Sequence, residues 1–170
     1  MEFILSRRSI RAYTPEPVSD ETVKEILTAA MAAPSAGNQQ PWHFVVINDR
    51  QLLDDVPKFH PHSKMITQAS VAVAVCGDLN IETHKGMWIL DCSAATQNLL
   101  LAAHAMGLGA VWLGIYPREG RMEGLRKLLH LPEHIIPLSL VPIGFPAERK
   151  PPSERFQKSR IHYNGWEEKG

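Results

Sequence analysis

The first candidate binding residues lie close to the amino terminus, where three arginines and two hydroxyl groups fall within residues 6–11. Guanidinium forks and hydroxyl groups suit the oxygens of a phosphate, and a charge-assisted hydrogen bond of this kind contributes about 1.5–3 kcal/mol. A solvated basic turn is the competing interpretation of the same spacing. The residues are Ser6, Arg7, Arg8, Ser9 and Arg11.

A second candidate is the polar loop over residues 33–43, which contains three consecutive amide side chains between two prolines. Amide groups donate and accept hydrogen bonds, and a glycine lets the backbone approach a flat ligand closely. This is more polar chemistry than a turn requires, although a helix stop followed by a turn remains the alternative. The loop contains Pro34, Ser35, Gly37, Asn38, Gln39, Gln40 and Pro41.

A third group is the glycine-rich stretch over residues 107–114, which superficially resembles a dinucleotide-binding fingerprint. That fingerprint follows a strand and opens a helix, whereas these glycines follow a predicted helix and open a predicted strand. We therefore interpret Gly107 as a helix stop and expect Gly114, near a strand end, to expose backbone amides to whatever lies above it.

Other chemistries find little support. His130 and His134 have helical spacing, but Pro132 between them would break the helix, so we expect no metal site. The sequence contains no Walker loop and no Gly-x-Ser-x-Gly elbow, and neither cysteine has a histidine near it in sequence. The sequence therefore gives no support for a hydrolase or a nucleotide triphosphatase.

The amino-acid composition limits the class of protein further. The 170 residues are 44% hydrophobic, which is enough for one domain with a real core, and we expect residues 1–170 to form that single domain. Lys plus Arg and Asp plus Glu both number 18, so no net field favours nucleic acid or an anionic membrane. Cys76 and Cys92 lie in apolar stretches, and the chain has neither a membrane-spanning run nor a secretory signal, so we expect a cytoplasmic protein without disulfides.

Hydrophobic periodicity places these motifs between helices and strands. Ser19 can cap a helix with Val23, Ile26, Leu27, Ala30 and Met31 on one face, and Pro34 closes it. The helix over residues 87–106 is apolar almost all round, which is typical of a helix at a domain centre or in a subunit interface. Strands are predicted over residues 43–48, 70–76, 110–115 and 137–145, and further helices over 52–56 and 118–130.

Strands separated by helices imply an α/β or α+β sandwich with a covered sheet. The segment over residues 147–170 differs, because it is polar and proline-rich and then ends in large apolar residues such as Tyr163 and Trp166. These have no predicted core near them in sequence, so we expect this tail to dock on a second copy of the chain.

Taken together, four segments in this order resemble the FMN-dependent nitroreductase family over nearly the whole chain. They are Arg7-Arg-Ser-Ile-Arg11, Ala33-Pro-Ser-Ala-Gly-Asn-Gln-Gln-Pro-Trp42, Gly107-Leu-Gly109 with Trp112-Leu-Gly114, and Pro142-Ile-Gly-Phe-Pro146 before a basic tail. The resemblance implies an α+β fold, a three-layer α-β-α sandwich with a mostly antiparallel central sheet. It also implies an intertwined homodimer with FMN bound at the subunit interface.

The resemblance assigns a role to each motif. Arg7, Arg8 and Ser9 resemble phosphate and ribityl contacts, and Arg11 resembles the cation near the pyrimidine edge of the flavin. Pro34, Ser35, Asn38 and Gln40 resemble contacts from the other subunit, and Leu113 and Gly114 the strand end that meets the reactive nitrogen. Lys150 or Arg155 resembles a late basic residue that returns to the phosphate, and Arg149 competes for that role.

The implied activity is an FMN-dependent NAD(P)H oxidoreductase with a ping-pong cycle, in which NADH or NADPH reduces FMN and the flavin then reduces a nitroaromatic, quinone or similar acceptor. This explains why no nucleophile or acid/base pair was found, since the chemistry belongs to the cofactor. The alternatives are a reductive dehalogenase, an oxygen-dependent flavin-cleaving enzyme and a flavin-binding protein without turnover. Candidate rim residues, each of which could equally be an ordinary surface or core residue, are His60, His62, Trp88 and Tyr116.

Overall fold

The structure is a computed structural model that describes residues 2–166. Its helices are α1 (Glu2–Ser6), α2 (Asp20–Met31), α3 (Arg50–Asp55), α4 (Trp88–Ala105) and α5 (Glu119–Leu129). Its strands are β1 (Trp42–Ile47), β2 (Val71–Asp78), β3 (Gly109–Ala110), β4 (Leu113–Gly114) and β5 (Ile135–Gly144). Short 3₁₀ turns occupy Ala36–Asn38, Val56–Lys58, Lys64–Gln68 and Lys158–Arg160.

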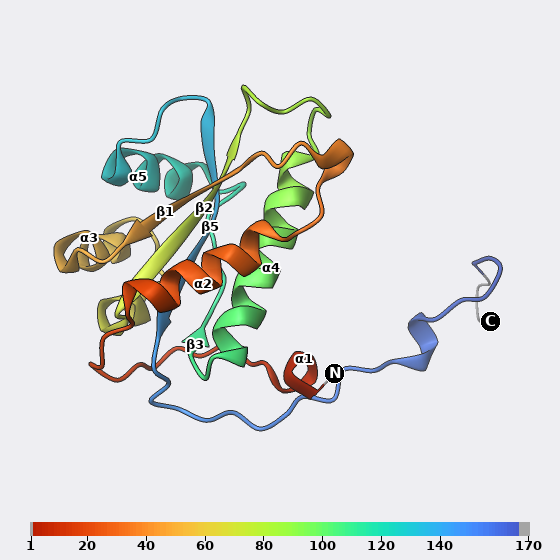
Figure 1. Cartoon of the computed structure of the whole chain (residues 1–170), viewed down its shortest axis with the longest axis horizontal. Helices are drawn as coiled ribbons and strands as arrows, with labels where there is room; N and C mark the ends of the chain where they lie inside the picture. The colour runs from red at the N-terminus through yellow and green to blue at the C-terminus, as the bar shows by residue number, and fades with distance from the viewer. Residues whose placement is uncertain (1, 167–170) are drawn as a thin grey trace.

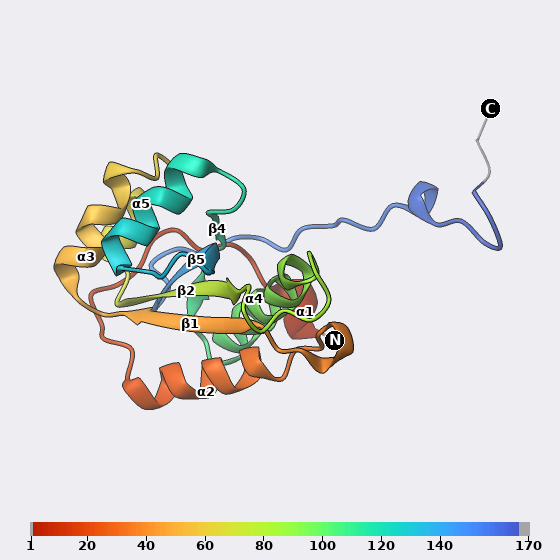
Figure 2. The same cartoon turned by 90° about the horizontal axis from the view of Figure 1, so that it is seen from above.

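The five strands form one antiparallel sheet in the order β1-β2-β5-β3, with β4 pairing further along β5 (Figure 1). Helices α2 and α4 pack on one face, and α3 and α5 pack on the other (Figure 2). The predicted α+β three-layer sandwich with an antiparallel sheet is therefore confirmed.

The position of strand β2 in the sheet explains why its sequence is a continuous apolar run. Successive side chains of a strand point to opposite faces. Val71, Val73 and Val75 belong to the core under α2 and α4, whereas Ala72 and Ala74 belong to the core under α3 and α5. A central strand covered on both faces needs apolar residues at every position.

Helix α2 begins where predicted, because the Ser19 hydroxyl accepts a hydrogen bond from the Thr22 amide. Its predicted apolar face is only partly right. Val23, Ile26 and Ala30 are buried, but Met31 is 49% exposed at the end of the helix. Met31 instead lines an open hollow between α2 and the edge strand β1.

The predicted strand over residues 110–115 is wrong in one respect, because it is interrupted. β3 and β4 pair with β5 in a single register, which places Val111 opposite Pro142. Proline has no backbone N–H to donate to the ladder. The chain therefore pairs before and after this point as two strands of two residues each.

Helix α4 is buried along one side and exposed along the other. Cys92, Ala95 and Leu99 are fully buried, whereas Met106 is 36% exposed beyond the end of the helix. Leu90 on the opposite side is 64% exposed. An apolar side chain this exposed on a mostly apolar helix is typical of a surface that another subunit covers.

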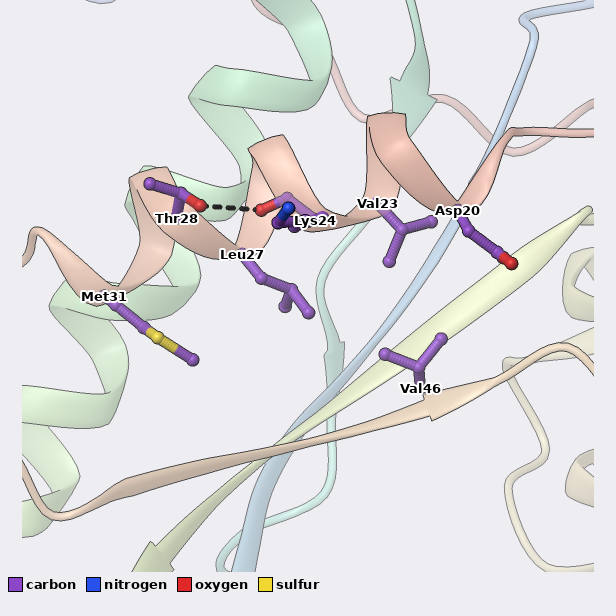
Figure 3. Close-up of a pocket in the computed structure, with 7 residues that line it drawn as sticks. All are labelled: Asp20, Val23, Lys24, Leu27, Thr28, Met31 and Val46. Atoms are coloured by element: carbon purple, nitrogen blue, oxygen red, sulfur yellow. Dashed lines mark hydrogen bonds between the residues drawn. The ribbon is translucent and has the colours of Figure 1, made fainter.

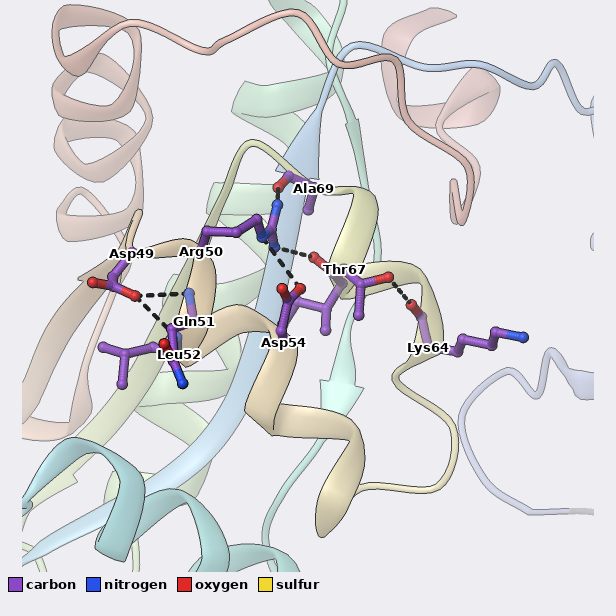
Figure 4. A network of polar contacts seen from close by, with 9 residues as sticks. Asp49, Arg50, Gln51, Leu52, Asp54, Lys64, Thr67 and Ala69 are labelled. Atoms are coloured by element: carbon purple, nitrogen blue, oxygen red, sulfur yellow. Dashed lines mark hydrogen bonds and ion pairs between the residues drawn. The ribbon is translucent and has the colours of Figure 1, made fainter.

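Helix α3 is held against the segment that precedes β2 by one arginine. Arg50 donates to the carbonyl oxygens of Ile66 and Ala69 and pairs with Asp54 at 3.2 Å (Figure 4). Asp49 caps the helix by accepting from two amides of its first turn. The predicted short helix over residues 52–56 therefore begins earlier than expected, at Arg50.

Two segments lie outside the sandwich. The short helix α1, which was not predicted, lies near the carboxyl end of α4 (Figure 1). The tail extends away from the sandwich after about residue 150, and Phe156, Tyr163 and Trp166 are 75–81% exposed (Figure 2). Of the tail predicted over residues 147–170, the last four positions lie outside the described residues. None of the helices in residues 2–166 is long and apolar enough to span a bilayer.

Cys76 and Cys92 are free and buried, as predicted, and the Cys92 thiol donates to the Cys76 carbonyl oxygen at 3.6 Å. Burial raises the pKa of the Cys76 thiol to about 12 and also raises that of Cys92. Both thiols therefore stay protonated and serve as small core residues.

Candidate functional site

The basic segment lies at the carboxyl end of α4. The Ser6 hydroxyl and His104 Nε2 are 2.9 Å apart, and the Ile10 amide donates to the Ala110 carbonyl oxygen at 3.1 Å. These two contacts fix the segment between α4 and β3. Beside it lies a cavity of about 950 Å³, lined by α1, Arg7, Gln97 and the tail residues 152–156.

The charged residues that line this cavity are two arginines, Arg7 and Arg155, and two glutamates, Glu2 and Glu154. Burial and the nearby charges of Arg155 and Arg8 lower the pKa of Arg7, which remains a cation. Within residues 2–166, none of the three arginines forms an ion pair with a carboxylate. The arginines repel one another, and their guanidinium groups stay free of a direct carboxylate contact, so they can bind an anion. The arrangement therefore suits a phosphate.

The structure distinguishes the tail cations that the sequence analysis assigned to a phosphate. Lys150 Nζ donates to the Ser9 carbonyl oxygen at 2.8 Å and pairs with Glu148 at 3.0 Å. Glu148 also accepts from the Arg11 amide, and this bond lowers the pKa of its carboxyl group. Lys150 is thus tied to the backbone of the basic segment, whereas Arg155 lines the large cavity with Arg7.

The amide-rich loop lies at the opposite end of α4 and is held by internal contacts. The buried Asp91 carboxylate accepts from the Ala36 amide at 2.9 Å and from Gln39 Nε2 at 2.6 Å. Gln39 Oε1 accepts from the backbone amides of Thr83 and His84 at 2.9 and 2.8 Å. The Gln39 side chain therefore has a structural role, because it connects the loop to α4 and to the segment before α4.

The flanking residues of this loop are turned outward. Gly37, Asn38 and Gln40 have φ angles of 54°, 56° and 47°, in the left-handed region. Ser35 Oγ accepts from the Gln40 amide at 3.0 Å, which secures the turn. Asn38, Gln40 and Pro34 are exposed, and neither amide side chain makes a hydrogen bond with another described residue. Their donors and acceptors remain available to a ligand or partner.

Leu113 and Gly114 lie between these two regions. Leu113 is buried and so offers only its backbone. Gly114 stands opposite Ser139, whose hydroxyl is 3.0 Å from that of Thr96 near the middle of α4. A side-chain carbon built on Gly114 would meet no atom within 4 Å, so a flat ligand could approach this backbone.

Within one chain the predicted residues are spread along α4. Asp91 anchors the amide loop and His104 contacts the basic segment, and a helix rises 1.5 Å per residue, so these anchors are about 20 Å apart. The basic segment lies near Lys150 and Arg155, but a single chain does not bring it to the amide loop. The two motifs can line one site only if a second copy supplies one of them.

Two of the candidate rim residues are core residues. Trp88 is 6% exposed, packs where a side chain on Gly77 would stand, and contacts Tyr116 edge-on with ring centroids 5.1 Å apart. His60 is 2% exposed. His62 is exposed and Tyr116 is half-buried, so these two remain candidates for contact with a bound molecule.

Sequence reasoning missed Asp91 and Glu148, which hold the two motifs in place. An acidic residue within an otherwise apolar predicted helix was a signal for Asp91, because a buried carboxylate needs donors. No local signal marked Glu148, since its partner Arg11 is far away in sequence.

Comparison with known proteins identifies the family of the chain. The model of the nitroreductase family matches residues 4–76 and 82–145. A Methanothermobacter thermautotrophicus protein, provisionally named NADH dehydrogenase/NAD(P)H nitroreductase, is 48% identical over 166 residues, covering 98% of this chain and 87% of that protein.

Solved structures agree as well. A Parabacteroides distasonis protein with the same provisional name has a TM-score of 0.93 and 44% identity, covering 97% of each chain. A provisionally assigned nitroreductase of Desulfovibrio desulfuricans, solved in complex with FMN, has a TM-score of 0.84 and 34% identity, covering 97% of this chain and 96% of that one. From these matches and the shared fold, we conclude that the chain belongs to the nitroreductase family.

Proposed function

We propose that the chain is an FMN-dependent NAD(P)H oxidoreductase that works as a homodimer and reduces nitroaromatic, quinone or similar acceptors in a ping-pong cycle. One observation carries this proposal. Arg7 and Arg155 line a cavity of about 950 Å³ beside Arg8, and none of the three has a carboxylate partner within residues 2–166. Guanidinium groups without a carboxylate partner are suited to bind the phosphate of a ligand.

The described residues fit FMN in three respects. The unpaired guanidinium groups of the cavity suit the phosphate, the open space over Gly114 suits a flat ring, and the free amides of Asn38 and Gln40 suit polar ring edges. Arg7, Arg8, Ser9 and Arg155 would hold the phosphate and ribityl chain. Arg11 would lie at the pyrimidine edge, and Pro34 and Ser35 would line the site from the other subunit. Lys150 would support the phosphate-binding segment through Ser9.

When bound, FMN accepts a hydride from NADH or NADPH and passes electrons to an acceptor. The chain contributes orientation and electrostatics to this chemistry. The exposed Arg11 places a fixed cation where negative charge develops, which favours reduction. Gly114 offers a backbone donor at a position without a side chain, so that a ring can approach it closely.

The proposed homodimer is supported by the spacing along α4 and by apolar surface that the single chain leaves exposed. Phe3, Ile4 and Leu5 of α1 are 46–68% exposed, and Leu90 lies on the open side of α4. A hollow of about 410 Å³ between α2 and β1 has apolar walls that include Met31 and Val46 (Figure 3). The tail carries exposed aromatic side chains that a second copy could bury.

Anaerobic absorbance spectroscopy tests the activity. We expect the purified protein to bind FMN, to turn yellow, and to lose the flavin band on adding NADH or NADPH. Adding a nitroaromatic or a quinone should then restore the band. A protein that binds FMN but is reduced by neither nucleotide would contradict the enzymatic proposal and favour a binding protein.

Sedimentation of the FMN-loaded protein tests the assembly. We expect a dimer, and we expect a chain that ends at Lys150 to lose both dimerisation and FMN. A monomer that keeps FMN tightly bound would contradict a site shared between two copies.

A further inference from the structure

The carbonyl oxygen of Gly114 is held by two side chains from different elements. His60 Nε2 lies 3.2 Å from it, and Arg121 Nη1 of α5 donates to it at 2.8 Å. His60 comes from the segment between α3 and β2. Two donors, one of them a cation, converge on the backbone of a strand only two residues long.

The histidine is arranged as a donor. The His62 backbone amide donates to His60 Nδ1 at 3.3 Å, so Nδ1 accepts and the proton of a neutral ring lies on Nε2. That proton points to the Gly114 carbonyl oxygen. Burial and the nearby charge of Arg121 lower the pKa of His60, which keeps the ring neutral.

The ladder of the sheet fixes where the other backbone group of Gly114 points. Along an antiparallel strand, N–H and C=O groups alternate between facing the partner strand and facing away. The Ile115 amide donates to the Leu138 carbonyl oxygen of β5 at 3.1 Å, so the preceding residue faces away from β5. The Gly114 amide therefore points outward on the same edge as its clamped carbonyl group.

Glycine is the residue for which such a clamp matters most. It has the widest range of backbone conformations, and open space surrounds the Gly114 α-carbon. The Ile115 amide bond to Leu138 holds one edge of the Gly114-Ile115 peptide, and the two donors hold its other edge. Held from both sides, the Gly114 backbone and its outward amide have little freedom to shift before a ligand arrives, as an effective fixed donor requires.

We propose that His60 and Arg121 are positioning residues that clamp the Gly114 carbonyl group and so hold the Gly114 backbone in place, with its amide facing the reactive edge of the flavin. This role rests on the proposed function, because it assumes that the flavin lies over β4. It assigns a task to two residues outside the predicted contact set, one of which was considered only as a rim residue.

The clamp itself can be measured in the full chain without FMN. Gly114-Ile115 is the only Gly-Ile pair in the sequence. Glycine labelled with carbon-13 at the carbonyl and isoleucine labelled with nitrogen-15 therefore give one peptide signal, which reports the Gly114 carbonyl group. We expect this carbonyl resonance to move upfield in Arg121→Met and in His60→Met, as a carbonyl does when it loses a hydrogen bond. His60→Gln should restore it, because its amide can donate.

The role in the reaction is measured by anaerobic stopped-flow reduction of the FMN-loaded protein. At saturating nicotinamide, we expect Arg121→Met and His60→Met to slow flavin reduction about tenfold, with the dissociation constant for FMN changed less than about threefold. His60→Gln should recover most of the rate. Arg126→Met is the matched control, because Arg126 also lies on α5 and donates to carbonyl oxygens, those of Pro132 and Glu133.

Three results would overturn the proposal. The Gly114 resonance could stay unchanged in both Met variants, the rates could stay near wild type although the resonance moves, or Arg126→Met could slow reduction equally. His60 is buried, so Arg121→Met, at a half-buried position, provides a result even if His60→Met fails to fold. A wild-type chain that takes up no FMN contradicts the proposed function and, with it, the role of the clamp.

Discussion

The two ends of α4 satisfy their polar groups in opposite ways. At the amino end, the Asp91 carboxylate and the Gln39 amide satisfy each other and the backbone of the loop. At the carboxyl end, Arg7 and Arg155 share a cavity, and neither forms an ion pair with any described carboxylate. The polar groups at the amino end bond to one another, whereas the arginines at the carboxyl end have no direct ion-pair partner among the described residues.

This difference separates stability from binding. Side chains that close their own hydrogen bonds contribute to the folded state, whereas side chains that lack partners are available to a ligand. Variants at the amino end should therefore change the free energy of unfolding, and variants at the carboxyl end should change the affinity for FMN.

The largest expected effect is on stability, at the amino end of α4. Asp91→Ala leaves the Ala36 amide and the Gln39 side chain without their buried acceptor, so we expect the free energy of unfolding to fall by about 3 kcal/mol. Urea denaturation measures it. Asp54→Ala, which removes only an exposed ion pair with Arg50, is the control and should cost less than about 1 kcal/mol. Equal losses of unfolding free energy in Asp91→Ala and Asp54→Ala would contradict a stabilising role of the contacts at the amino end.

The next effect is on binding, at the carboxyl end. Arg7→Ala removes a charge-assisted contact, so we expect FMN affinity to fall about tenfold to a hundredfold by fluorescence titration. The apo protein should be no less stable than wild type, because Arg7 is repelled by Arg155 and Arg8. Lys58→Ala, on the opposite face of the sheet, should leave affinity unchanged. If Arg7→Ala bound FMN with unaltered affinity, the phosphate would not bind in this cavity.

A smaller effect tests the backbone of the amide loop. Gly37 has φ 54° and packs against the His84 ring, so Gly37→Ala introduces both strain and a clash. We expect a loss of about 1–2 kcal/mol, seen as a Tm lowered by several degrees. Adding His84→Ala should recover the part due to the clash and leave the part due to strain. A Tm unchanged by Gly37→Ala would mean that this loop is not fixed as described.

The smallest effect concerns pH and a site outside both ends. Burial and Arg121 lower the pKa of His60, so the unfolded chain takes up this proton more readily than the folded one. The stability that depends on neutral His60 is complete above the ordinary pKa of 6.5 and is lost as the pH falls below it. As the pH falls below 6.5, we expect the Tm of the wild type to fall more than the Tm of His60→Gln. The exposed control variant His62→Gln should show the same pH dependence as the wild type. Equal pH dependence in the wild type and His60→Gln would contradict the prediction.

Much of the fold could be predicted because its signals are local. The Ser19 cap, the two-sided apolar run of β2 and the stop of α4 at Gly107 each depend on residues near one another in sequence. The interruption between β3 and β4 could not be predicted from local sequence, because it depends on Pro142 in the paired strand β5. The same limit applies to Trp88, whose burial depends on the space above Gly77.

The sequence by itself determined which residues are candidates for binding: a basic segment, an amide loop and a glycine at a strand end. It could do so because charge, hydrogen-bonding groups and the absence of a side chain are properties of individual residues. Only the tertiary structure decided that the first two lie at opposite ends of α4 and that His60 and Arg121 converge on the Gly114 carbonyl group. Such distances depend on how helices pack across the sheet, which brings together residues far apart in the chain.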